Sequence, residues 1–544
     1  MKVLVNRHWK MFLFAGLFLY LFIISLQSLT FTDEGFYLSS YQTFFPDPAS
    51  NGYFFMYYMT MLIGGIWEKI AGGGGILSFR LLNNFTVLVC VWIACFSFRS
   101  LTDKKIPLVM ASIFTVVFLS FSLTSFSYNT LSLFLACLLF LQIVQYYQTD
   151  SYKYIVYTGF IVGVSLFTRI PNILFLIIPA PVLLAKRAGM TIYFSLMCGF
   201  LCGILFVLLL MTALGHVPLF IQVIQDVFTL GTSNESAHGI SKMFDVYIYN
   251  IRDVLAVVLT CYAIYSVVQR KLIKTVILLV LVISYWVMAL TGFVYRPGLY
   301  GVIYGVLYFS LILYWRNNSW CHSERSQLIA LHSYLGMSLT FIYPIGSDHG
   351  IYNVANISTF WLCFVICIIW LDDYRHATTY RIALVIISFF TIVVLDRVVV
   401  SPSFSKFSRI ECVMKPRESS LANIYMTPEM TTELDRILKY IKKYTKKGDY
   451  VLCYPNIPMI NYLSETRPYL YNCWPRQYTR SLLKHYLDKA VTEKESLPVV
   501  VRQKHFIKDD KFRLLKEFVT QNHYRIVVSD SKYEVLVSTR VRVQ

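Results

Sequence analysis

Two adjacent acids, Asp33 and Glu34, follow the first apolar run of the chain within the sequence SLTFTDEGFYLSS. That run, residues 11–29, is long enough to cross a bilayer, because a spanning helix needs about 20 apolar residues. The acids therefore stand at the membrane edge opposite to Arg7 and Lys10. A carboxyl group that is partly desolvated at such an edge has a raised pKa, which makes it a usable general base for a hydroxyl group.

Arginines on the same predicted membrane face supply the matching positive charge. Arg169 follows an apolar run in LFTRIPN, and Arg296 lies between two later runs in GFVYRPG. A guanidinium group presents a planar fork of N–H donors that suits a phosphate at the level of the lipid headgroups. Arg80, at the start of the second predicted span, is a third candidate. Acids and arginines on one face indicate chemistry in which a hydroxyl is deprotonated while an anionic leaving group is held.

A second polar stretch, IYPIGSDHGIYN, places Asp348 and His349 on the same face, as a second acid or an acceptor site. Each candidate also has a purely structural interpretation. The acid pair could begin an interfacial helix, and Arg169 could be an anchor that snorkels to the bilayer edge. Arg296 could cap a span, the Gly-Ser-Asp-His-Gly stretch could be a tight turn, and Arg80 could pair with a loop acid.

The composition is that of an α-helical polytopic membrane protein. Of the 544 residues 56% are hydrophobic and only 15% are charged, and the mean hydropathy is +0.56, which excludes an ordinary soluble domain. The net charge of +19 is not gathered into one aromatic stripe, so no nucleic-acid partner is expected. Residues 401–544 hold 26 basic and 15 acidic residues, which suits an anionic lipid surface or a phosphorylated substrate.

Apolar runs predict about thirteen transmembrane helices within residues 1–400. Basic residues gather in alternate loops, which the positive-inside rule assigns to the cytoplasm together with the N-terminus. An odd number of spans places the tail outside with the acid pair, in an inner-membrane protein. Outer loop 31–78 is expected to carry interfacial helices, since residues 53–71 are rich in aromatic side chains. The predicted spans are 11–30, 79–98, 107–125, 129–147, 154–168, 171–185, 190–214, 251–268, 273–291, 298–315, 327–344, 356–371 and 382–400.

Residues 401–544 predict a soluble, extracytoplasmic α/β domain. Thr427 and Pro428 form a helix-start signal ahead of LDRILKYIKKY, and DYVLCYP has the pattern of a buried strand. A helix over 476–492, the strand PVVVRQ, a helix in FRLLKEFVTQ and two strands in YRIVVSDSKYEVLVST complete it. No phosphate-binding Gly-rich loop occurs in it, so nucleotide binding is not expected.

Cysteines give little information about redox state or metals. Eight of the twelve lie in apolar runs, and no Cys-x-x-Cys pair or zinc-type Cys/His cluster occurs. A disulfide between Cys453 and Cys473 in the tail is left open by the sequence. Metal dependence is also left open: no cofactor is certain, and a divalent cation remains an alternative.

The order of these features resembles the GT-C glycosyltransferases, the fold of the protein O-mannosyltransferase and lipid A aminoarabinose transferase families. The resemblance is carried by T-D-E-G-F-Y at the outer edge, the Gly run with L-S-F-R-L-L-N-N, and GVSLFTRIPN. It covers most of the chain in topology. VLCYPNIPMINYLSETRPY is similar to the tail segment that folds back over the site in that fold.

The resemblance implies a function and a role for each matching residue. Asp33 would be the catalytic base, Glu34 would orient it or a bound cation, and Arg169 would contact the donor phosphate. Relatives carry a second acid where this chain has Asn129, which puts a two-carboxylate mechanism in doubt unless Asp348 supplies the missing acid. The implied reaction moves a sugar from a polyprenyl-phosphate donor to a glycan, lipid or protein hydroxyl at the outer membrane face. The alternatives are an O-antigen-type polymerase or ligase, and a lipid or sugar transporter.

Overall fold

The computed structural model describes most of the chain. The described residues are 2–120, 125–232, 240–268, 276, 280, 283, 299–317, 323–347, 350–352, 355–372, 408–504, 510–530 and 532–539. The candidates Arg296, Asp348 and His349 lie outside them, as do the predicted span 382–400 and all but residues 276, 280 and 283 of the predicted span 273–291.

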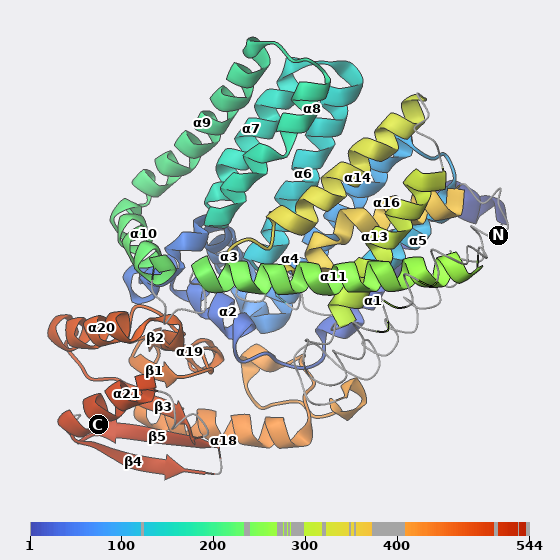
Figure 1. Cartoon of the computed structure of the whole chain (residues 1–544). Coiled ribbons are helices and arrows are strands. Elements are labelled where there is room, and N and C mark those ends of the chain that lie inside the picture. The colour runs from blue at the N-terminus through green and yellow to red at the C-terminus, as the bar shows by residue number, and fades with distance from the viewer. Residues whose placement is uncertain are drawn as a thin grey trace.

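The body of the molecule is a set of long, apolar helices that lie above the tail in Figure 1. Two 3-10 helices, η1 (Pro48–Tyr57) and η4 (Ile170–Ile177), interrupt it. The α-helices of the body are α1 (Lys2–Ser25), α2 (Asp33–Thr43), α3 (Tyr58–Ala71), α4 (Gly75–Ser97), α5 (Lys105–Leu119), α6 (Tyr128–Thr149), α7 (Tyr152–Leu166), α8 (Pro179–Ala185), α9 (Met190–Ala213), α10 (Val217–Thr232), α11 (Ile240–Val268), α13 (Leu299–Asn317), α14 (Glu324–Ile342), α15 (Ala355–Ser358) and α16 (Phe360–Asp372).

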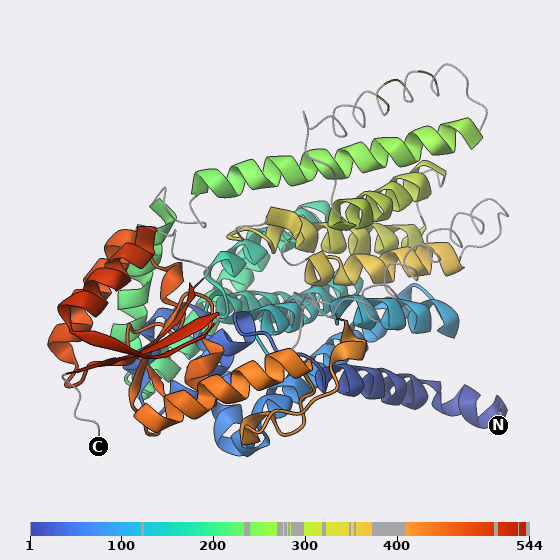
Figure 2. The ribbon, with the colours of Figure 1, turned by 90° about the horizontal axis from the view of Figure 1, so that it is seen from below.

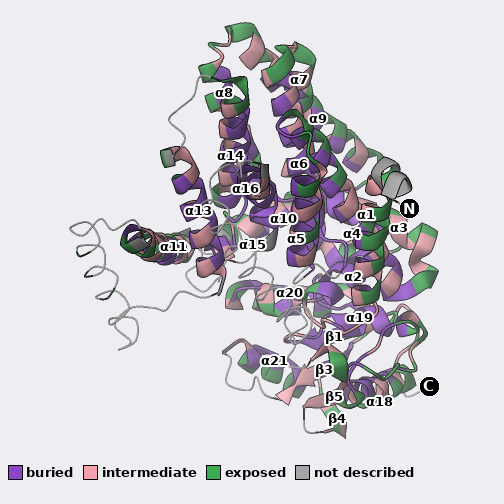
Figure 3. Ribbon diagram, turned by 90° about the vertical axis from the view of Figure 1, so that its right-hand side faces the viewer, coloured by how far each residue is buried: buried purple, intermediate pink, exposed green. Residues whose placement is uncertain are grey.

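Five stretches of the described chain are helical, long and apolar enough to cross a membrane. Many large apolar residues on these helices are exposed. Figure 3 shows exposed residues along the helices of the body in green. Phe194 and Leu209 on α9 are 70% and 61% exposed. Such a surface is stable against lipid chains and not against water. The five stretches are His8–Ser25, Pro48–Ser100, Tyr128–Thr149, Met190–Ala213 and Ser241–Val267.

Small residues hold α7 and α9 together. A Cβ atom at Gly159 would lie 2.1 Å from the carbonyl oxygen of Leu196, and one at Gly203 would lie 2.4 Å from that of Phe160. The two backbones can therefore touch only because side chains are missing there, which is the usual way for membrane helices to pack. This contact fixes the direction of α7, whose end leads to Arg169.

Several predicted spans have different boundaries in the structure. The first ends at Ser25 and not at residue 30, because Leu26 and Ser28 exchange backbone hydrogen bonds with Tyr425 of the tail, at 2.7 and 2.8 Å. The predicted helix 171–185 is divided into η4 and α8, and 356–371 into α15 and α16. Residues 53–71 form the end of η1 and then α3, which has 14 residues and spans about 21 Å, short of a bilayer.

The described part of the tail forms a five-stranded sheet with helices, whereas the sequence predicts only four of these strands and misses β2. The strand order is β2-β1-β3-β5-β4, with β1 parallel to β2 and β3, and β5 antiparallel to β3 and β4. Thr427 caps the first helix by accepting from Met430 N. The elements are α18 (Pro428–Tyr444), β1 (Tyr450–Tyr454), α19 (Met459–Leu463), β2 (Arg467–Pro468), α20 (Arg480–Glu493), β3 (Val499–Gln503), α21 (Asp510–Gln521), β4 (Tyr524–Ser529) and β5 (Tyr533–Ser538).

The tail packs directly against α2, which lies between the body and the tail in Figure 1. A Cβ atom at Gly35 would lie 2.2 Å from Met459 N, so α19 approaches α2 as closely as a glycine allows. Met459 N donates to Phe31 O at 3.1 Å, and Ser39 Oγ donates to Pro458 O at 2.9 Å. The segment 454–468 therefore folds back onto the helix that carries Asp33.

Candidate active site

Asp33 and Glu34 occupy the first turn of α2, but they point to different surroundings. Asp33 is exposed, whereas Glu34 is 1% exposed. Carboxylates in the first turn of a helix are stabilised by its dipole, so the structural interpretation of this pair holds for both. Only Asp33 is also accessible to a reactant.

Glu34 forms a buried, two-point ion pair with Arg80 of α4. Arg80 Nε donates to Glu34 Oε1 and Arg80 Nη2 donates to Glu34 Oε2, both at 2.8 Å. Ser125 Oγ donates to the same carboxylate. The remaining donors of Arg80 go to the carbonyl oxygens of Ser25 and Ser28, at 2.8 and 2.9 Å, and of Gln27, at 3.1 Å.

This network engages all five N–H donors of Arg80. Arg80 therefore has no N–H donor left for a phosphate, and the structure does not give it the phosphate contact that the sequence led us to expect. Instead the residue ties α4 to the end of α1 and to the start of α2. The carboxylate of Glu34 binds Arg80. This differs from the role expected for Glu34, which was to orient Asp33 or a bound cation.

Arg169 lies where α7 ends and η4 begins, and it is 7% exposed. Its Nη1 donates to Tyr343 O, and its Nη2 donates to Ile345 O at 2.8 Å. The guanidinium carbon lies 5.1 Å from the centroid of the Tyr343 ring. Among the described residues these carbonyls take two of the five donors, so the cation is held in place and can still bind an anion.

A cluster of tyrosines from α2, η1 and α6 is close enough to both Asp33 and Arg169 to be influenced by their charges. Tyr57 of η1 and Tyr128 of α6 stack with ring centroids 4.3 Å apart and an interplanar angle of 9°. The charges of Asp33 and Arg169 both act on these two phenols. Tyr37 of α2 meets Tyr128 edge-on at 5.6 Å; its pKa is raised well above the usual value by burial first, then by Tyr128 and Asp33.

Asn129 also belongs to this region. Its Oδ1 accepts a hydrogen bond of 2.6 Å from the hydroxyl of Tyr343, the residue whose ring and carbonyl contact Arg169. The structure therefore brings together Asp33, Asn129 and Arg169 from distant parts of the sequence. The tyrosines were missed by sequence reasoning; their signal was the aromatic density of residues 53–58 and the Tyr-Asn pair at 128–129.

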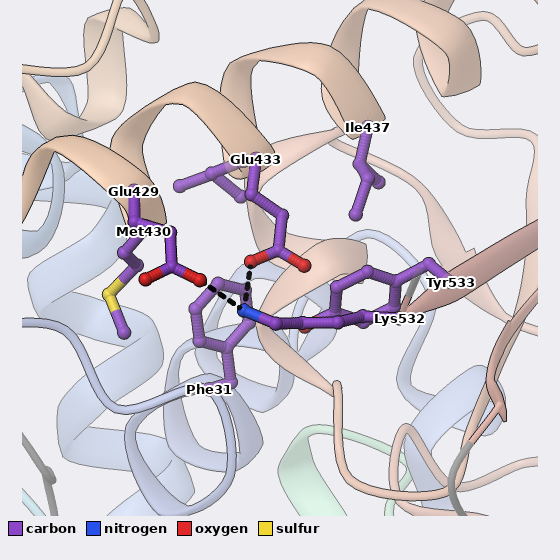
Figure 4. A pocket seen from close by; sticks show the side chains of 8 residues that line it. Phe31, Glu429, Met430, Glu433, Ile437, Lys532 and Tyr533 are labelled. Carbon is purple, nitrogen blue, oxygen red and sulfur yellow. Dashed lines mark hydrogen bonds and ion pairs between the residues drawn. The ribbon is translucent and has the colours of Figure 1, made fainter. Parts of the chain in front are cut away.

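Phe31, two residues before Asp33, lines a small pocket together with residues of the tail (Figure 4). The pocket has a volume of about 120 Å³, and its apolar wall includes Leu434 and Ile437 of α18. Lys532 also lines the pocket and pairs with two acids of α18, with Nζ–Oε distances of 3.1 Å to Glu429 and 2.8 Å to Glu433. The tail thereby fixes the backbone that leads into α2.

The described residues contain no group of three or more His, Cys, Asp or Glu side chains that could hold a metal ion. Cys453 and Cys473 are buried free thiols in the structure and form no disulfide. Burial is the main cause of the raised pKa of both thiols.

The chain has the GT-C fold of membrane glycosyltransferases, because it superposes from end to end on a solved protein of that fold. That protein is ArnT, a lipid A aminoarabinose transferase, from Cupriavidus metallidurans bound to undecaprenyl phosphate. The TM-score is 0.54 and the identity 11%, over 97% of this chain and 98% of that one. The expected fold class is confirmed, while the count of thirteen helices stays a prediction.

Two further solved structures are similar at lower scores. The apo state of the same ArnT gives a TM-score of 0.42 at 11% identity, over 98% of each chain. The apo oligosaccharyltransferase of Archaeoglobus fulgidus gives 0.46 at 12% identity, over 98% of this chain and 75% of that one. No family model and no curated protein matches the sequence.

Proposed function

We propose that the protein is a membrane glycosyltransferase that moves a sugar from a polyprenyl-phosphate donor to an acceptor hydroxyl. The observation that supports this most directly is a chain of contacts between α2, which carries Asp33, and Arg169. Tyr37 of α2 packs on Tyr128, with ring centroids 5.6 Å apart. The next residue, Asn129, accepts from Tyr343, which contacts Arg169. In the proposal a base and an anion-binding group thus share one aromatic surface. The solved ArnT, which shares the fold, was crystallised with undecaprenyl phosphate.

In the proposed reaction Asp33 accepts the proton of the acceptor hydroxyl as its oxygen attacks the anomeric carbon of the sugar. The bond between that carbon and the phosphate oxygen breaks, with inversion at the carbon. The electron pair leaves with the polyprenyl phosphate, whose negative charge is stabilised by the N–H donors of Arg169. The stacked tyrosines exclude water from the sugar, which favours transfer over hydrolysis.

Asp33→Asn is the variant that tests this role. Turnover of the purified protein is measured with a panel of polyprenyl-phosphate sugars. We expect a loss of about 10²-fold or more, because a positioned general base contributes at least that much. Asp150→Asn is the matched control. Asp150 is an exposed acid at the C-terminal end of α6, and its Oδ1 lies 3.0 Å from Lys186 Nζ. Unchanged turnover in Asp33→Asn would exclude the mechanism.

The proposed sidedness has a separate test. The N-terminus is proposed to be cytoplasmic, and the tail and Asp33 to lie outside. Lys484→Cys on the exposed face of α20 and Lys153→Cys at the start of α7 each add one accessible thiol. A membrane-impermeant thiol reagent added to intact cells should label the first and not the second. Labelling of the second alone would place the site in the cytosol and refute the proposal.

A further inference from the structure

A cavity of about 670 Å³ opens at the other membrane edge, between the N-terminal end of α1 and the start of α5. Figures 1 and 2 show this end of α1 away from the sheet of the tail. Helix α4 has 23 residues, or about 35 Å, between its start near Arg80 and its end near the cavity. That length covers the hydrocarbon core of about 30 Å, so the cavity and Asp33 lie on opposite sides of the membrane.

The lining of the cavity is rich in basic residues. Lys10 comes from α1, Arg99 from the turn after α4, and Lys104 and Lys105 from the beginning of α5. Asp103 is the one carboxylate among the lining residues. Three separate segments of the chain therefore bring four cations around one hollow, and its volume lies within the usual range of about 300–1,000 Å³ for ligand sites.

The wall of the cavity continues into a surface suited to lipid chains. Trp9 lines the cavity, and its ring centroid lies 5.7 Å from Lys10 Nζ. Tryptophan is favoured at the level of the lipid headgroups. Met11, which also lines the cavity, and Ile106 beside it are 61% and 69% exposed. A ligand with an anionic head and apolar chains would satisfy both parts of this surface.

We propose that this cavity binds the anionic headgroup of a membrane phospholipid. The positive-inside rule alone requires basic loops on this edge but no common hollow for them. Lys153 and Arg187 show the difference, since they are exposed cations at the start of α7 and after α8, on the same expected edge but outside the cavity. Basic pockets between membrane helices at this edge are suited to phospholipid headgroups. The site is independent of the reaction proposed for Asp33.

Native mass spectrometry of the full chain can measure the binding. Phosphatidylglycerol and phosphatidylcholine with identical chains are the probes, and inorganic phosphate is the competitor. We expect the anionic lipid to bind at least about tenfold more tightly than the neutral one, and Lys10→Gln with Arg99→Gln to weaken it by about tenfold. Lys153→Gln with Arg187→Gln, which removes the same charge outside the cavity, should leave the affinity unchanged.

Three results would overturn the proposal. Equal affinity of the wild-type protein for the two lipids would show that the headgroup charge is not recognised, and this comparison needs no variant. An equal loss in both double variants would show that the effect comes from the general charge of this edge. Displacement of the lipid by millimolar inorganic phosphate would identify the cavity as a site for a soluble anion.

Discussion

Two carboxylate–arginine sets lie at the same membrane edge, and they differ in how far each arginine is engaged. Arg80 gives all five of its donors to Glu34 and to three carbonyl oxygens. Arg169 gives two donors to carbonyl oxygens and makes no ion pair among the described residues. A fully engaged, buried pair serves the fold, whereas a held cation with spare donors can bind a ligand.

The two neighbouring acids differ in the same way. Glu34 and Arg80 side chains are 0% and 1% exposed, so neither can meet a substrate without breaking the network. Asp33 is exposed, and its charge and that of Arg169 both influence Tyr57 and Tyr128. One residue along a helix turns the side chain by about 100°, which is enough to bury one acid in an ion pair and to leave the other exposed for the chemistry proposed for it.

Removal of one partner of the buried pair is expected to have the largest effect. Arg80→Met leaves the Glu34 carboxylate buried without its cation, and loss of one partner of such a pair costs about 3–5 kcal/mol. The thermal unfolding midpoint in detergent should fall sharply, with activity lost through unfolding. A stable Arg80→Met protein that has lost donor binding would reverse the comparison and assign the phosphate to Arg80.

Arg169→Lys should reduce activity with little effect on folding. The lysine keeps the charge but cannot reproduce the planar fork, so we expect a loss of about 2 kcal/mol, or roughly thirtyfold in kcat/KM. Steady-state kinetics with a polyprenyl-phosphate sugar measures it. Arg187→Lys, at an exposed position on the other edge, is the control. If Arg169→Lys unfolds while its kcat/KM per folded molecule is normal, the residue serves the fold as Arg80 does.

Much of the tail could be predicted from sequence because its elements have local signals. Thr427 before Pro428 starts α18, and alternating or continuous apolar runs mark β1, β3, β4 and β5. The two-residue strand β2 has no such signal, since its pairing partner in β1 determines it. Local pattern therefore predicts elements well and contacts poorly.

The site shows the same limit. Asp33, Glu34 and Arg169 were identifiable as costly charges at a membrane edge. Their partners were not, since Glu34 and Arg80 are 46 residues apart and Tyr343 and Asn129 are 214 apart. The sequence cannot distinguish the two acids, because they are adjacent carboxylates at the same expected membrane depth. Only the folded chain shows that Glu34 is paired with Arg80 while Asp33 is exposed.

Phe31→Ala should separate the position of Asp33 from the Glu34–Arg80 pair. The Phe31 ring is partly buried against the hydrophobic core and lines the pocket beside the tail, so its loss should cost about 1.5 kcal/mol, well below the value for a fully buried ring. We also expect a severalfold lower kcat with little change in KM. Met430→Ala removes an apolar group from the same pocket without touching the Asp33 backbone, and it should lower stability alone. An equal kcat for both variants would show that the tail does not position Asp33.

Lys494 extends the comparison to a third cation, one that is partly buried, and here the expected effect is smallest. Its Nζ lies 3.9 Å from the Tyr450 ring centroid and donates to Pro468 O at 3.3 Å. Burial, which outweighs the opposing charge of Asp47, lowers the pKa of Lys494 to about 7. Because the unfolded chain keeps the usual, higher pKa, it binds more protons above pH 7, so stability rises with pH there.

The rise should be at most about 1 kcal/mol between pH 7 and pH 8 and should level off below pH 7, where both states are protonated. Thermal unfolding of wild type and Lys494→Met at a series of pH values measures the difference. The variant should lose this part of the pH dependence, and Lys484→Met, at an exposed position of α20, should keep it. A wild-type stability that is flat between pH 7 and pH 8 would mean that the tyrosine rings hold the charge of Lys494 as firmly as Glu34 holds that of Arg80.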